Sequence, residues 1–74
     1  MRSEHKSKSS LAPHQQRVLD ERDEVSAKLV KLSAFLDGEI FLGLDWEEQN
    51  RLKRQRSIMT QYVEVLDERI EVFS

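Results

Sequence analysis

The sequence contains no cysteine, only one proline and only two glycines in 74 residues. Without cysteine the chain can form neither a disulfide nor a thiolate metal site, and it fits a reducing compartment. With so few turn-forming residues, little is available to separate the short strands of a β-protein. No apolar run reaches the roughly 18 residues that a membrane-spanning helix needs. The composition therefore predicts an all-α protein that does not cross a membrane.

The chain also lacks a large excess of either charge, because it contains 12 basic and 14 acidic residues. A domain dedicated to nucleic acid is more often net basic, so composition does not favour that role. Chains this short bury a small core and usually need a further stabilising device. Disulfides are excluded, and His5 and His14 are too far apart in sequence to form a metal pair. We therefore expect self-association, as a homodimer or a higher oligomer.

The first ten residues are polar and contain no apolar stretch of the kind found in secretory signals. We expect residues 1–10 to form a flexible tail, followed by a single domain over residues 11–74. The expected location is the cytoplasm.

The first long periodic segment predicts a helix over residues 13–37. Pro13 is tolerated in a first turn, because its missing N–H would have no partner there. Gly38 is expected to end the helix in the left-handed conformation. Apolar residues occupy most positions of a seam with alternating spacings of four and three. The seam positions are Leu11, Gln15, Val18, Arg22, Val25, Leu29, Leu32 and Leu36.

Two polar residues, Gln15 and Arg22, interrupt this seam. A polar seam residue can fix helix register or oligomeric state at some cost in stability. We expect Arg22 to pair with a carboxylate of the second helix, namely Glu64, Asp67 or Glu68.

A second helix is predicted over residues 46–73, antiparallel to the first. Asp45 and Glu48 have the spacing of a capping box. The connecting residues 38–44 are too apolar for an exposed loop, and we expect their large side chains to plug the open end of the hairpin. These are Ile40, Phe41, Leu42 and Leu44. Trp46 is expected to pack against Phe41 or Leu42, with an exposed anchor for a partner as the alternative.

The second helix is apolar over an arc wider than one partner helix can cover. We therefore expect two hairpins to associate into a four-helix bundle. The candidate interface residues are Leu52, Ile58, Met59, Tyr62, Val65, Leu66, Ile70 and Phe73.

Charge is distributed unevenly along the hairpin. Basic residues cluster in its loop half, at Lys28, Lys31, Arg51, Lys53, Arg54 and Arg56, whereas the far half is acidic. Three interpretations remain open. The cluster is a solvated helix face, it pairs with the acidic half of another copy, or it binds the phosphates of a nucleic acid or nucleotide. Asp45, Glu47 and Glu48 oppose the third interpretation, and the run contains no aromatic residue for base stacking.

Catalysis finds no support in the sequence. It contains no nucleophile–base–orienter set, no phosphate-cradling glycine loop and no metal-binding motif. We expect a protein that is not an enzyme and needs no cofactor or metal.

The order of motifs resembles a group of small tailed-phage and prophage helical-hairpin proteins to which no activity is assigned. The resemblance spans residues 13–73 and rests mainly on apolar heptad positions. It implies a phage accessory protein that acts in the host cytoplasm on a host factor. The matching residues are His14, Gln15, Gln16, Arg17, Val18, Lys28, Lys31, Leu32, Phe35, Leu36, Phe41, Leu44, Glu48, Leu52, Gln55, Met59, Tyr62, Leu66, Arg69, Ile70 and Phe73.

In size and hairpin shape the chain is also similar to phage anti-defence sponges, which oligomerise and sequester cyclic nucleotides. The sequence motifs of those sponges do not occur here, so the resemblance assigns no binding residue. The leading hypothesis is an oligomeric protein-interaction module that modulates a host factor or host defence. The alternative is a binder of a phosphate ligand, either nucleic acid or a signalling cyclic nucleotide, through the basic flank of the hairpin.

Overall fold

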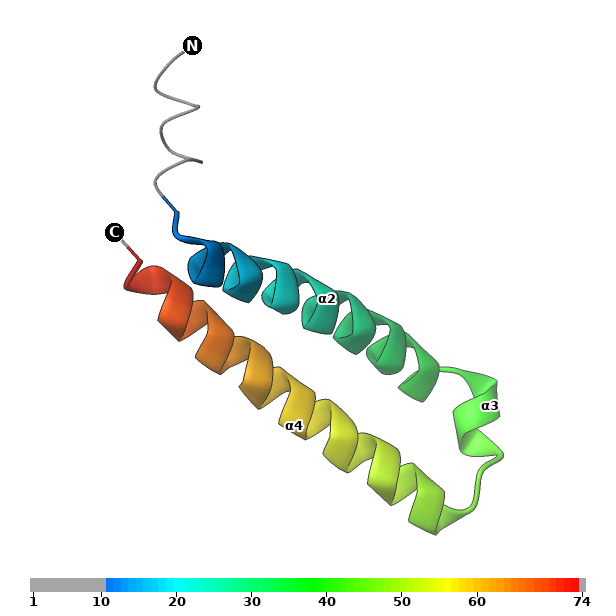
Figure 1. Cartoon of the computed structure of the whole chain (residues 1–74). Coiled ribbons are helices and arrows are strands. Elements are labelled where there is room, and N and C mark those ends of the chain that lie inside the picture. Colours follow the sequence, from blue (N-terminus) through cyan, green and yellow to red (C-terminus); the bar gives the residue numbers. More distant parts are fainter. Residues whose placement is uncertain (1–10, 74) are drawn as a thin grey trace.

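The chain folds into an antiparallel helical hairpin, as the periodicity predicted. The computed structural model describes residues 11–73. Its helices are α2 (Pro13–Leu36), α3 (Glu39–Leu42) and α4 (Trp46–Glu71). Helices α2 and α4 lie side by side, with α3 at the closed end (Figure 1). The long helices end slightly before the predicted residues 37 and 73, and the predicted tail, residues 1–10, lies outside the described residues.

The end of α2 differs from the prediction. Gly38 has φ −98° and ψ 174°, which is extended backbone and not the left-handed conformation. The helix closes with a tight last turn, in which Asp37 donates to the Ala34 carbonyl at 3.2 Å and Gly38 to the Phe35 carbonyl at 3.1 Å. Gly38 is extended because it also precedes α3 as its N-cap residue. The prediction of a left-handed Gly38 was therefore wrong.

The connection contains the single helical turn α3, where the sequence predicted an irregular loop. Phe41 is only 6% exposed, and Leu44 is half-buried. Ile40 and Leu42 are 70% and 73% exposed, because one helical turn can direct only one side toward the hairpin. The predicted plug thus consists of Phe41 with support from Leu44, and the prediction was wrong for Ile40 and Leu42.

Gln49 ties the connection to α4. Its side-chain amide donates to the carbonyl of Phe41 at 2.9 Å and to that of Leu44 at 3.2 Å, with a longer contact of 3.4 Å to Leu42. The last carbonyls of a helix need partners outside the helix, and this amide supplies them. The arrangement fixes the angle at which the chain enters α4.

Replacing Gln49 with alanine is expected to lower the free energy of unfolding by about 1–2 kcal/mol, because part-buried carbonyls lose a donor. Urea denaturation followed by circular dichroism measures this. Gln61→Ala is the matched control, since Gln61 is exposed on the same helix. Equal midpoints for the two variants would show that the amide does not hold the connection.

The start of α4 follows the prediction for Asp45, but only this half of the predicted capping box forms. The Asp45 carboxylate accepts a hydrogen bond from the Glu48 backbone N–H at 2.8 Å and is the N-cap. The Glu48 carboxylate accepts from Arg51 Nε, also at 2.8 Å, and so points along the helix. Trp46 is exposed, so the expectation that it packs against Phe41 or Leu42 was wrong.

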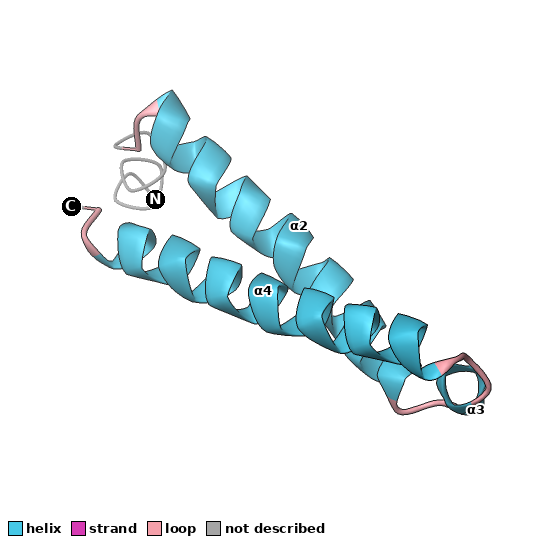
Figure 2. Cartoon of the chain, turned by 90° about the horizontal axis from the view of Figure 1, so that it is seen from below, coloured by secondary structure: helices cyan, strands magenta, loops and turns pink. Residues whose placement is uncertain are grey.

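The buried core is very small. Among the described residues only Val18, Phe41 and Leu66 are buried, and half-buried seam residues surround them. The molecule measures 54 × 21 × 15 Å. Since one helix with side chains is roughly 10–12 Å across, the hairpin is a layer one helix thick. The long helices are inclined to each other, and in the view of Figure 2 they overlap near α3 and separate toward the termini. Such a layer has two open faces.

Candidate binding site on α4

Helix geometry divides the basic run between two faces of α4. Arg51 and Arg54 are three residues apart and therefore share a face. Lys53 and Arg56, also three apart, lie on a different side. Lys53 Nζ lies 5.9 Å from the centroid of the Phe41 ring, and Arg56 is half-buried. The run of four basic residues thus supplies two arginines, not four, to any one surface.

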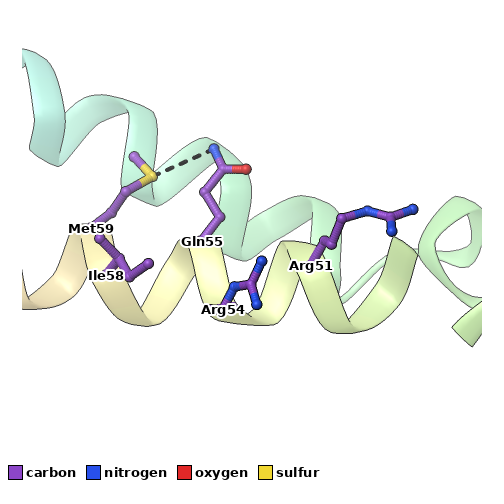
Figure 3. A pocket seen from close by; sticks show the side chains of 5 residues that line it. All are labelled: Arg51, Arg54, Gln55, Ile58 and Met59. Atoms are coloured by element: carbon purple, nitrogen blue, oxygen red, sulfur yellow. Dashed lines mark hydrogen bonds between the residues drawn. The ribbon is translucent and has the colours of Figure 1, made fainter. Parts of the chain in front are cut away.

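Arg51 and Arg54 line a hollow of about 340 Å³ together with Gln55, Ile58 and Met59. All five residues belong to α4. Figure 3 shows Gln55 and Met59 directed toward α2, with Gln55 Nε2 3.8 Å from the Met59 sulfur, while Arg54 lies along α4 between Ile58 and Arg51. The hollow combines guanidinium groups and an amide with an apolar wall. The hollow is shallow and open to solvent, because one helix alone supplies its lining.

The two guanidinium groups of the hollow differ in their partners. Arg51 uses its Nε–H for Glu48, which leaves its terminal N–H groups available. Arg54 forms no ion pair with any residue in the described range 11–73. Glu48 holds Arg51 in place but also brings a negative charge close to the site. Arg54 is therefore the stronger candidate for direct contact with an anion.

The hollow includes a residue that the sequence-based prediction passed over and excludes several that it selected. The sequence analysis names Gln55 among the residues that resemble the phage hairpin proteins but not among the candidate site residues. Gln55 follows Arg51 by four positions and therefore lies on the same face of the helix. Lys28 and Lys31 are exposed on α2 and do not line the hollow. Neither do Lys53 and Arg56.

The eight candidate interface residues fall into three groups by exposure. Leu66 is fully buried within the hairpin, so in this conformation it cannot reach another copy. The half-buried residues lie along the hairpin seam, and these are Leu52, Met59, Ile70 and Phe73. The exposed ones are Ile58, Tyr62 and Val65, which lie on a neighbouring face.

The two polar seam residues act within the hairpin. Arg22 Nε lies 3.6 Å from an oxygen of Asp67 and 3.6 Å from one of Asp23. The predicted pairing with helix α4 is therefore confirmed, with Asp67 as the partner. The Gln15 side chain accepts a hydrogen bond from the Ala12 backbone N–H at 3.0 Å, so it caps the first turn of α2.

Other kinds of site are not formed by the described residues. Within residues 11–73, no group of three histidine, aspartate or glutamate side chains converges as metal ligands would. In the same part of the chain, no helix is both long enough and apolar enough to cross a bilayer.

Comparison with models of known protein families shows which family the hairpin belongs to. Residues 12–72 match the family model described as Sequestin. The chain belongs to the Sequestin family. The match runs from the residue before α2 to the residue after α4, so it covers the whole hairpin of this chain. Searches of curated proteins and of solved structures returned no match.

Proposed function

We propose that this member of the Sequestin family is a non-catalytic binding protein that holds a phosphate-bearing small molecule of the nucleotide class. The observation that carries the proposal is the hollow on α4, where Arg51 and Arg54 lie beside Ile58 and Met59. Guanidinium groups form paired, charge-assisted hydrogen bonds with phosphate oxygens. The apolar side chains offer a surface for a base or a ribose. A nucleotide has both parts.

One further observation is compatible with this proposal. The name of the family, Sequestin, suggests that its members hold a ligand. In this proposal the protein acts in the cytoplasm of a phage-infected host cell and lowers the free concentration of a signalling nucleotide.

Calorimetric titration at low ionic strength tests the proposal, with linear and cyclic adenine mono- and dinucleotides as probes. We expect saturable binding that weakens as salt is raised, because the contacts are electrostatic. A gel-shift assay with short DNA and RNA oligomers tests whether the phosphate ligand is instead a nucleic acid. If nothing binds at low salt, the proposal fails, because electrostatic contacts are strongest there.

Arg54→Gln is expected to weaken nucleotide binding about tenfold or more, since a hydrogen bond to a charged group is worth roughly 1.5–3 kcal/mol. Lys28→Gln is the control, because it removes the same charge from an exposed residue outside the hollow. The ratio of the two dissociation constants is the measured quantity. Equal weakening in both variants would indicate a diffuse charge effect and no site at the hollow.

A second candidate function, docking to a host protein, is favoured by a different surface. Ile40, Leu42 and Trp46 are large apolar residues, all exposed at the closed end of the hairpin. Exposed tryptophan is enriched at the centres of protein interfaces. A pull-down from host lysate with the intact chain and with Trp46→Ala tests this, with Val72→Ala at the opposite end as the control. Equal recovery of partners by both variants would exclude the closed end.

A further inference from the structure

The Glu48 carboxylate has two donors within its reach. In the chain without ligand it accepts a hydrogen bond from Arg51 Nε at 2.8 Å. Glu48 is also the third residue of α4, the position from which a glutamate side chain can reach back to the N–H of the N-cap residue, here Asp45. Among residues 11–73, no group accepts a hydrogen bond from that N–H. Arg51 therefore holds the acceptor that would complete the capping box.

Helix α2 of the same chain shows the other arrangement. Its third residue, Gln15, accepts a hydrogen bond from the N–H of its N-cap residue, Ala12, at 3.0 Å. The residue three positions after Gln15 is Val18, which offers the amide no competing donor. The two N-cap backbones match, with φ −69° and ψ 155° at Ala12 and φ −67° and ψ 160° at Asp45. Asp45 is therefore already in the conformation in which the side chain at position 48 can accept from its N–H.

A phosphate in the hollow would compete with Glu48 for Arg51. Arg51 lines the hollow, and its side chain extends toward the start of α4 (Figure 3). While Glu48 occupies Nε, only the two terminal nitrogens can form paired hydrogen bonds with a phosphate, and two anions share one guanidinium group. The Glu48 and Arg51 side chains are 40% and 59% exposed, and exposed ion pairs contribute little to stability. The pair can therefore open at low cost.

We propose that Glu48 regulates the hollow by exchanging partners. Without ligand it holds Arg51, and when a phosphate takes Arg51 it turns back to the Asp45 N–H and completes the capping box. Ligand binding then stabilises the first turn of α4, which carries the exposed Trp46. The movement on ligand binding rests on the proposed function, whereas the competition of Arg51 and Asp45 for Glu48 does not.

Amide exchange with solvent, measured by NMR without ligand, tests the competition. Glu48→Gln keeps an acceptor at position 48 but removes the charge that attracts Arg51. We expect exchange of the Asp45 amide to slow by about threefold or more, because a hydrogen-bonded amide must open before it exchanges. The Trp46 amide, which has no acceptor among residues 11–73, is not expected to slow.

Glu47→Gln is the matched control for this measurement. It removes the same charge from the neighbouring exposed residue, which forms no ion pair within the described part of the chain. The Asp45 amide is expected to keep its rate in this variant. Slowing in neither variant, or equal slowing in both, would overturn the competition for Glu48.

The same measurement with the adenine mono- and dinucleotides used for calorimetry tests the movement. Saturating nucleotide is expected to slow the Asp45 amide of the wild-type chain but not the Trp46 amide, because only Asp45 gains an acceptor. In Glu48→Gln the nucleotide should cause no further slowing, since the acceptor is already in place. A bound anion that acted only through its charge would slow both amides. Slowing of both, or of neither, in the wild-type chain would overturn the movement of Glu48.

Affinity separates this proposal from the function on which it partly rests. Glu48→Gln is expected to bind nucleotide about threefold more tightly than Glu47→Gln, because the ligand no longer has to displace an ion pair of the exposed kind. Equal affinities would mean that Glu48 acts through its charge alone and would overturn its role as a competitor. If Arg54→Gln weakens binding but the Asp45 amide does not respond to nucleotide, the function stands and the movement is overturned. If no nucleotide binds but the Asp45 amide slows in Glu48→Gln, the proposed function fails and the competition stands.

Discussion

Leu66→Ala is expected to cause the largest loss of stability of any single substitution on α4. Leu66 has no exposed surface, and the other buried residues of the described chain are Val18 and Phe41. Truncation of a buried leucine costs about 2–5 kcal/mol, through lost transfer energy and the cavity that remains. A chain of this length has a total stability of roughly 4–11 kcal/mol, so the variant is expected to lose a large part of it. Thermal unfolding followed by circular dichroism should show a melting temperature lower by about 10 °C or more.

Val30→Ala is the control for this prediction. It shortens an exposed apolar side chain on the other long helix, and its effect is expected to stay within about 0.5 kcal/mol. Both variants must be compared at one protein concentration, because self-association would make the melting temperature depend on concentration. Similar melting temperatures for the two variants would show that the hairpin is not held by a core around Leu66.

The elements that the sequence predicted well are those determined by local chemistry. Asp45 has the spacing of an N-cap, and its carboxylate accepts the Glu48 N–H. Alternating spacings of four and three place Val18 on the seam of the first helix, where it is buried. Arg22 was predicted to pair with a carboxylate of the second helix, and its Nε lies 3.6 Å from an oxygen of Asp67. Each of these follows from helix geometry and from one or two neighbouring residues.

The connection was predicted less well because its conformation depends on tertiary contacts. Glycine after an apolar periodic segment usually indicates a left-handed helix end. Here the chain turns directly into α3, and the Gln49 amide, several residues later, satisfies the carbonyls of Phe41 and Leu44. Hydropathy alone did not show which side of α3 faces the hairpin. Phe41 therefore could not be distinguished in advance from Ile40 or Leu42.

The sequence predicted the candidate site from the number of basic residues in one run, whereas the structure shows which of them share one side of α4. The basic run lies in the part of α4 that lines the hollow, but counting charges grouped Lys53 and Arg56 with Arg51 and Arg54. A helical projection of the sequence would have separated the two pairs and added Gln55 and Ile58. It would not have revealed the ion pair between Arg51 and Glu48, because that depends on side-chain conformation. This pair leaves Arg54 as the main anion-binding candidate.

Phe41→Ala is the second substitution with a large expected effect, and it acts at the closed end. Phe41 is the buried residue of α3, and Lys53 Nζ lies over its ring, 5.9 Å from the centroid. Loss of a buried phenylalanine costs about 3–5 kcal/mol. Because Gln49 binds the carbonyl of the same residue, the connection is expected to loosen together with the first turns of α4. Amide hydrogen exchange should therefore accelerate in residues 38–50 before it does around Leu66.

Leu42→Ala is the matched control, because Leu42 is the next residue along the chain and is mostly exposed. Its expected effect on stability is within about 0.5 kcal/mol. The pair also separates two views of the closed end. If Phe41→Ala destabilises the chain and Leu42→Ala does not, the apolar character of the connection serves two purposes: Phe41 closes the hairpin, and Ile40, Leu42 and Trp46 remain available as an outward surface. Equal effects would mean that the whole connection is buried in the folded protein in solution, and the docking surface proposed at the closed end would then be lost.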